Sequence, residues 1–338
     1  MRGHAGAGGH RFDQAVVRRG DLATNRILCD RSGMTNPFLA DELISLRDIL
    51  RHAVSRFRAA ELVHAHGATT ALDEAAYLIL ETLHLPVDQL EPFIDARLTR
   101  AEREKLLGLI EARISTRKPA AYLTGRTYIQ GIPFKVDERV IVPRSYIGEM
   151  LFSGLFGGED FALIDDVQAV TRVLDLCTGS GCLAILAAHI FPNARIDAAE
   201  LSVDAMAVAR MNVAESGFAD RINLFQGDLF APLQGKTYDL IITNPPYVDA
   251  DTMAQLPPEF LAEPSMALAG GADGMDIVRR ILKDAGRHLT KTGGMICEIG
   301  TDRQILDSEY PSVDFLWLDS IESSGEVFWV TASQLRGI

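Results

Sequence analysis

Apolar residues recur at helical spacing in the first third of the chain. From about residue 41 they fall three and four positions apart on one stripe, and a second stripe follows Thr70. A third stripe follows Thr99, where Thr99 and Glu102 form a capping-box pattern in which each side chain accepts a hydrogen bond from the other residue's backbone N–H. This spacing predicts a small helical domain over residues 34–120.

The period then shortens toward two. Between Tyr122 and Val142, apolar residues alternate around the turn residues Gln130 and Gly131, which is typical of a β-hairpin. We therefore expect residues 121–142 to form a hairpin linker.

Beyond Pro143, short runs of strand-forming residues alternate with helical stretches. Five such runs cover residues 173–176, 196–199, 222–225, 240–243 and 294–299, and two more, 313–318 and 326–331, follow without a helix-length segment between them. Strands that alternate with helices form parallel sheets covered on both faces. This alternation predicts an α/β fold for residues 143–338, with a doubly wound and mainly parallel sheet and an antiparallel C-terminal strand.

The first 33 residues follow neither period. They are rich in glycine and arginine, and we expect a disordered extension. A targeting peptide is the alternative, but the segment has no apolar core and contains acidic residues. Our hypothesis is that Met34 is the natural start.

Composition limits the classes of function. The 338 residues carry 33 basic and 46 acidic side chains, a net charge of −13, which disfavours nucleic-acid binding and suits a basic partner. No apolar run approaches the roughly 20 residues of a membrane span. The four cysteines form no C-x-x-C pair, so we expect reduced thiols, no metal site and a cytoplasmic protein. The sequence does not indicate an oligomeric state.

The strand at residues 173–176 leads directly into a glycine loop. The loop consists of Cys177, Thr178, Gly179, Ser180 and Gly181. Glycines let a backbone approach a ligand closely, and the N–H groups of the following helix face it. A plain strand-to-helix turn explains these glycines about equally well, so the context has to decide.

Two carboxylates supply that context. Glu200 ends the next strand, where an acidic residue can accept both hydroxyls of a ribose. Asp228, followed by Leu229, comes after the third strand and could accept from an adenine amino group. The ordinary alternatives are a solvated carboxylate at Glu200 and a turn or cap residue at Asp228.

The strand at residues 240–243 leads into Asn244, Pro245, Pro246 and Tyr247. Prolines fix the backbone and leave carbonyls that no neighbouring N–H competes for. With the Asn244 side-chain oxygen they can accept both hydrogens of a planar –NH₂ group, while Tyr247 packs on its face. A barely nucleophilic amide nitrogen held in this way could attack a methyl carbon in line with a sulfonium leaving group.

In this order the motifs resemble the HemK/PrmB family of class I (Rossmann-like) S-adenosylmethionine-dependent methyltransferases, which modify glutamines on translation proteins. The resemblance runs from about Leu43 to the C-terminus. It implies that residues 177–181 line the methionine and ribose of S-adenosylmethionine, and that Glu200 binds the ribose diol. It also implies that Asp228 and Leu229 bind the adenine, that residues 244–247 hold the glutamine amide, with Asn244 also at the cofactor, and that the helical domain recognises the substrate.

Within this family, residues 136–149 and Asn-Pro-Pro-Tyr-Val-Asp at 244–249 resemble the enzymes that act on the N(5) amide of a glutamine in large-subunit ribosomal protein L3. The release-factor enzymes typically have Pro-Arg-Pro-Glu-Thr-Glu where this chain has Pro-Arg-Ser-Tyr-Ile-Gly-Glu. Glu200 replaces the more usual Asp, and Tyr146 stands where Pro is common.

Four alternatives stay open at this point. They are a release-factor glutamine methyltransferase, a methyltransferase of adenine amines in DNA or RNA, a non-catalytic ribosome-assembly protein and a nicotinamide dehydrogenase. The nucleic-acid enzyme would need a basic groove. A dehydrogenase would have no use for Asn-Pro-Pro-Tyr.

Overall fold

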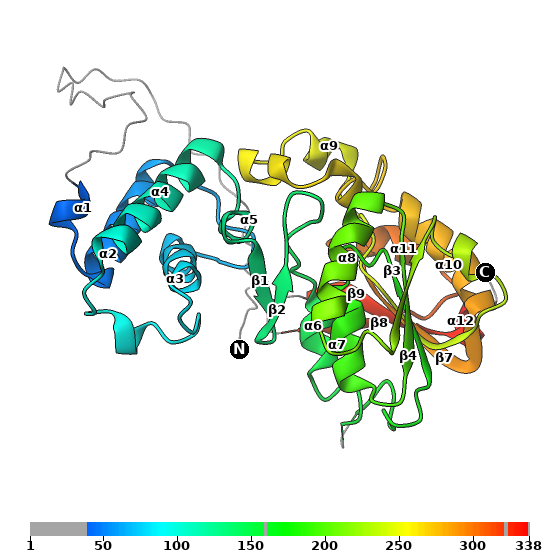
Figure 1. Cartoon of the computed structure of the whole chain (residues 1–338). Coiled ribbons are helices and arrows are strands. Elements are labelled where there is room, and N and C mark those ends of the chain that lie inside the picture. The colour runs from blue at the N-terminus through cyan, green and yellow to red at the C-terminus, as the bar shows by residue number, and fades with distance from the viewer. Residues whose placement is uncertain (1–38, 159–160, 321–323, 337–338) are drawn as a thin grey trace, which may run out of the picture. The chain divides into compact units, whose positions relative to one another are not determined.

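The structure is a computed structural model that describes residues 39–158, 161–320 and 324–336. The predicted extension and the proposed start at Met34 lie outside these residues. Helices come first along the described chain (Figure 1). They are α1 (Leu39–Glu42), α2 (Leu46–Ala59), α3 (Ala71–Thr82), the 3₁₀ turn η1 (Glu91–Phe93), α4 (Arg100–Thr116) and α5 (Ala120–Thr124).

Two of the three predicted helices begin where the sequence indicates. The Thr70 side chain caps α3 by accepting from the Asp73 N–H, and Thr99 and Glu102 form the predicted capping box at α4. The start predicted for the first helix, at about residue 41, is wrong. Ser45 forms a capping box with Asp48, so the continuous stripe is broken and α2 begins at Leu46.

The predicted hairpin consists of β1 (Arg126–Ile129) and β2 (Ile132–Lys135), paired antiparallel. Gln130 and Gly131 have φ angles of 50° and 74°, and positive φ at both positions is the mark of a type I′ turn. The predicted linker also contains a short helix, because α5 precedes the hairpin.

A seven-stranded sheet in the order β5-β4-β3-β6-β7-β9-β8 forms the rest of the fold. Its strands are β3 (Arg172–Leu176), β4 (Arg195–Glu200), β5 (Ile222–Gln226), β6 (Tyr238–Thr243), β7 (Leu289–Glu298), β8 (Leu316–Asp319) and β9 (Ser324–Thr331). The strands from β3 to β7 pair in parallel and β9 pairs antiparallel with both neighbours, which confirms the predicted sheet. Strand β8 begins later than the predicted run of residues 313–318. Val313 and Phe315 lie in the segment before it and pack into the core.

Helices cover both faces of this sheet (Figure 1). Buried residues of α6 (Tyr146–Leu151) and α7 (Cys182–Ile190) share one apolar core with the sheet, and those of α10 (Asp276–His288) and α12 (Ala332–Leu335) share the other. The remaining helical segments are α8 (Val203–Glu215), α9 (Ala250–Met253), α11 (Arg303–Glu309) and the 3₁₀ turns η2 (Ala231–Leu233), η3 (Pro258–Ala262) and η4 (Ser265–Ala267).

The parallel strands end at the same edge of the sheet, so the loops that follow β3, β4, β5, β6 and β7 lie together there. No helix within the described ranges has the length and apolar character needed to cross a membrane.

Candidate functional site

A buried carboxylate organises the glycine loop after β3. Asp175 is fully buried, and its Oδ2 accepts from the Thr178 hydroxyl at 2.5 Å and from the Ala184 N–H at 2.9 Å. Burial raises the pKa of Asp175 to about 7. This one side chain joins the end of the strand, the loop and the first turn of α7.

The loop itself uses left-handed backbone. Cys177, Gly179 and Gly181 have φ angles of 58°, 57° and 81°. A Cβ added at Gly181 would lie 3.4 Å from Ala209, whereas one added at Gly179 would meet nothing within 4 Å. The loop is therefore packed against α8 on one side and leaves open space at Gly179 on the other.

Glu200, at the end of β4, braces this loop. Its carboxylate accepts from the Gly179 N–H at 2.9 Å and from the Ser202 N–H at 2.8 Å. The Thr178 N–H also donates to the Ala199 carbonyl, at 3.1 Å. A carboxylate has about four acceptor positions, so two are used by the backbone and two can accept from a ligand.

Asp228 lies at the same edge with a partner of its own. The Gly227 N–H donates to the Glu200 carbonyl at 2.9 Å, which places the loop after β5 beside the end of β4. The Asp228 carboxylate pairs with Arg280 at 2.6 Å, and both side chains are about half exposed. Leu229 has a φ angle of 47°, in the left-handed region. Arg280 is not among the site residues that the sequence motifs predict.

Asn244 follows β6, the strand that pairs with β3, so it and the glycine loop follow neighbouring strands. Its side chain is partly buried, and its amide has no hydrogen-bond partner among the residues that the structure describes. Pro245 after it is buried. The arrangement leaves an oriented amide available to a ligand.

The segment of residues 268–274 holds the residues that follow the two prolines. The Val248 N–H donates to the Leu268 carbonyl, and the Gly270 N–H donates to the Val248 carbonyl, each at 2.8 Å. A Cβ at Gly274 would lie 2.3 Å from the Tyr247 carbonyl oxygen. The glycines of this segment thus allow two stretches of backbone to approach each other closely.

Tyr247 is fixed at both its ring and its hydroxyl. A Cβ at Gly300 would lie 2.9 Å from the ring, and the hydroxyl donates to Glu298 Oε1 at 3.2 Å. The other oxygen of Glu298 accepts from the Ser145 hydroxyl at 2.6 Å and from the Tyr146 N–H at 3.0 Å. Glu298 is not among the site residues that the motifs predict, although a carboxylate at the end of an apolar strand is a signal of this kind of site.

A carboxylate anchors the chain before α6 to the segment after α9. Glu263 is buried and forms two contacts with Arg144, at 2.6 and 2.8 Å, and one with the Val142 N–H at 2.9 Å. Burial opposes its ionisation, but His66, 3.6 Å away, and Arg144 outweigh that effect and hold the pKa of Glu263 at about 2.

Glu259, on η3, makes the matching connection to the helical region. It is fully buried, pairs with Arg117 at 2.8 Å and accepts from the Val63 N–H at 3.1 Å. Together Glu259 and Glu263 fix the segment that follows the Asn-Pro-Pro-Tyr loop.

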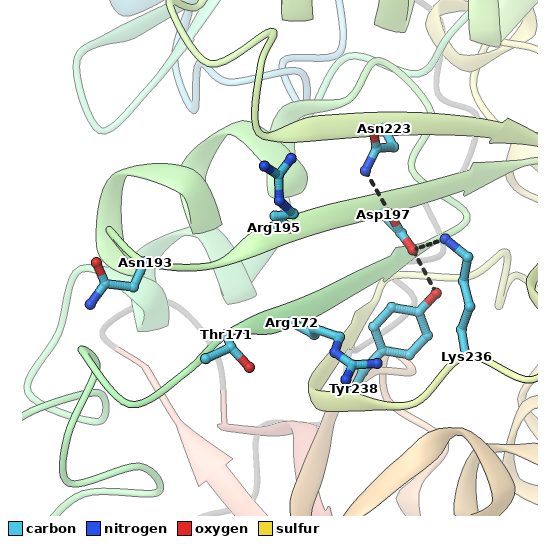
Figure 2. A pocket seen from close by; sticks show the side chains of 8 residues that line it. All are labelled: Thr171, Arg172, Asn193, Arg195, Asp197, Asn223, Lys236 and Tyr238. Carbon is cyan, nitrogen blue, oxygen red and sulfur yellow. Dashed lines mark hydrogen bonds and ion pairs between the residues drawn. The ribbon is translucent and has the colours of Figure 1, made fainter.

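A cavity of about 420 Å³ lies at the opposite edge of the sheet (Figure 2). It is lined by residues at the amino ends of the strands, among them Arg172, Arg195 and Tyr238. Asp197, another lining residue, accepts from Asn223, Lys236 and Tyr238 (Figure 2). The cavity is therefore separate from the edge that holds the glycine loop and Asn244.

The comparisons with known proteins identify the family of the chain. A family model described as methyltransferase small domain matches residues 161–274, a range that contains both the glycine loop and Asn244 to Tyr247. The chain is 59% identical to a protein of Bradyrhizobium diazoefficiens over 87% of this chain and 92% of that one. It is 51% identical to a protein of Burkholderia pseudomallei, over 87% and 96% of the two chains.

A third relative, from Xanthomonas campestris, is 44% identical over 88% of this chain and 94% of its own. All three relatives are named ribosomal protein uL3 glutamine methyltransferase. These matches confirm the resemblance that the motifs carry. The chain therefore belongs to the family of ribosomal protein uL3 glutamine methyltransferases.

Proposed function

We propose that this protein transfers a methyl group from S-adenosylmethionine to the N(5) amide nitrogen of a glutamine in ribosomal protein uL3. Family membership supports the reaction and the substrate. The observation that carries the proposal is the Asn244 amide, which has no partner among the described residues and follows the strand next to the glycine loop.

The residues after β3 and β4 fit the proposed cofactor. Gly179 opens onto free space, and Glu200 retains acceptor positions beyond its two backbone contacts. We assign the ribose hydroxyls to Glu200 and the methionine part to residues 177–181. Asp228, with Leu229, is assigned to the adenine end, where Arg280 neutralises part of its charge. When bound, S-adenosylmethionine supplies a methyl group activated by a sulfonium.

Asn244 and Pro245 then act on the substrate amide. An amide nitrogen shares its lone pair with its carbonyl, so it is a poor nucleophile. The Asn244 side-chain oxygen and the Pro245 carbonyl accept its two N–H groups, which aims the nitrogen and stabilises the positive charge that develops there as the N–CH₃ bond forms and the S–CH₃ bond breaks. The electron pair of the broken bond stays with the sulfur, and the methylated nitrogen loses one proton to solvent. Loss of one preorganised group of this kind costs about 2.7–4 kcal/mol of barrier in other enzymes.

The first test measures transfer of tritiated methyl from S-adenosylmethionine to purified uL3, with the product located by mass spectrometry. We expect a glutamine peptide that is heavier by one methyl group. Asn244→Ala should lower turnover roughly 100- to 1,000-fold because it removes one acceptor. Affinity for S-adenosylhomocysteine, measured by calorimetry, should change little.

Asn193→Ala is the matched control, because Asn193 is exposed and lies on the cavity at the opposite edge of the sheet. That variant should keep wild-type turnover. Equal loss of turnover and cofactor affinity in Asn244→Ala would place Asn244 in the cofactor site alone. Wild-type transfer to a release factor or to adenine-containing RNA, with none to uL3, would replace the proposed substrate. A lack of transfer to all three would favour a binding protein.

We also propose that the protein acts in the cytoplasm. Its proposed substrate is a ribosomal protein, and the described cysteines Cys177, Cys182 and Cys297 are free thiols. The net charge of −13 favours encounter with a basic ribosomal protein.

A further inference from the structure

We infer that Glu298 is a positioning residue for methyl transfer, which sets the place of Tyr247 beside the substrate amide. The inference rests on the proposed function, because it assigns Tyr247 to the substrate side of the site. It concerns a buried carboxylate that has no part in the cofactor or amide contacts described above.

Three chain segments meet at this carboxylate. One oxygen accepts from the Tyr247 hydroxyl at 3.2 Å, and the other accepts from the Ser145 hydroxyl at 2.6 Å and the Tyr146 N–H at 3.0 Å. Glu298 thereby joins the loop after β6 to the N-terminal turn of α6, more than 100 residues earlier.

The sheet places Glu298 close to the reacting groups. Cys297 pairs with Thr243, so the next residues along the two parallel strands are Glu298 and Asn244. Glu298 is 1% exposed, so water competes little for its oxygens. Since Gly300 lies against the ring of Tyr247, the ring has a packed face and the hydroxyl has a charged acceptor.

The charge of Glu298 decides how well it performs this role. Ionised, it accepts from all three donors, whereas a protonated carboxyl gives up an acceptor position. Burial raises the pKa of Glu298 to about 7, despite these three hydrogen bonds, and the negative charge of Glu326 on β9 acts in the same direction. The positive charge of Arg144, in the chain before α6, opposes the rise in the pKa of Tyr247 that burial and Glu298 cause. Methyl transfer should therefore rise with pH through about 7.

The kinetic experiment measures kcat and KM for uL3 between pH 6 and 9, in the wild type and in Glu298→Gln. The amide keeps the size of the side chain but cannot ionise. We expect Glu298→Gln to lower kcat at pH 8 at least about tenfold, since bonds to a charged acceptor are lost. The inflection near pH 7 should disappear, and affinity for S-adenosylhomocysteine should stay the same.

Two variants separate positioning from other effects. Asp175 has a pKa of about 7 beneath the glycine loop, so Asp175→Asn should retain the kinetic inflection that Glu298→Gln loses. Tyr247→Phe removes only the hydroxyl. If Glu298 acts through Tyr247, the double variant should be little slower than the slower of the two single variants.

A readout without turnover keeps this inference distinct from the proposed function. In protein labelled at tyrosine Cζ, the carbon resonance of Tyr247 should shift with a midpoint near pH 7 in the wild type and stay constant in Glu298→Gln. No methyl transfer by the wild type, with this titration present, would defeat the proposed substrate but keep the coupling. A kinetic inflection that persists in Glu298→Gln, additive effects in the double variant or a silent Tyr247 resonance would each overturn the inference.

Discussion

At the scale of single residues, Glu200 has two tasks for one carboxylate. It already accepts from the N–H groups of Gly179 and Ser202, and the proposed ribose hydroxyls need its remaining acceptor positions. We expect Glu200→Ala to weaken binding of S-adenosylhomocysteine by about 1.5–3 kcal/mol for each bond lost to the charged group. Isothermal calorimetry measures this directly.

Glu200→Gln is the appropriate comparison, because it keeps the length of the side chain and one carbonyl-type acceptor. We expect its affinity to fall between those of the wild type and the alanine variant. Unchanged affinity in Glu200→Ala would remove this residue from the proposed cofactor site.

At the scale of elements, the Asn-Pro-Pro-Tyr loop depends on the close approach of a glycine segment. Gly274 has a φ angle of 82°, and a Cβ there would come within 2.3 Å of the Tyr247 carbonyl oxygen. Gly274→Ala should therefore reduce methyl transfer by displacing Tyr247, and should destabilise the protein by more than about 1 kcal/mol in urea unfolding. Binding of S-adenosylhomocysteine should persist.

Gly131→Ala supplies the control for backbone strain. Gly131 has a similar φ angle of 74° in the hairpin turn, but a Cβ there meets nothing within 4 Å. It shares the conformational cost without the contact to Tyr247. Equal effects of the two substitutions on turnover would show that the contact with Tyr247 is unimportant.

Local patterns predicted most of these elements because their causes are local. The five parallel strands are apolar runs bounded by turns, and the caps at Thr70 and Thr99 lie within four residues of the groups they satisfy. The start of α2 was missed because its capping box uses Asp48 in place of the Glu or Gln that the pattern looks for.

The candidate site was predictable where its residues follow strands directly. Asn244, Glu200 and the glycine loop belong to that group, and Glu298 shares the position of Glu200 as the last residue of a parallel strand. The bracing roles of Glu298 and Glu263 were not predictable, because they depend on Ser145 and Arg144, which lie more than 100 positions away in the sequence. No spacing rule connects such residues before the sheet is assembled.

At the scale of the whole molecule, Glu263 makes the free energy of unfolding depend on pH. His66 and Arg144 hold its pKa at about 2 in the folded protein, below the ordinary value of 4.5. The ionised carboxylate contributes fully to the free energy of unfolding above about pH 4.5, and this contribution is lost as the pH falls toward 2. We expect Glu263→Gln to remove on the order of 3 kcal/mol from the free energy of unfolding at pH 7, and less near pH 3.

Urea unfolding at the two pH values tests this. Glu104→Gln is the control, because Glu104 forms an exposed pair with Arg100 on one face of α4 and should cost at most about 1 kcal/mol. A loss in Glu263→Gln that is the same at both pH values would show that the ionised carboxylate is not its cause.

The contact between Glu259 and the N-terminal helical region has a consequence for the order in which the protein folds during synthesis. Val63 and Glu259, joined by a hydrogen bond, are 196 positions apart, and Val142 and Glu263 are 121 apart. During synthesis the early helices leave the ribosome long before either carboxylate exists. Arg117 therefore lacks its buried partner Glu259 until the chain has been translated beyond residue 259. The connection that completes the N-terminal helices is among the later steps of biogenesis.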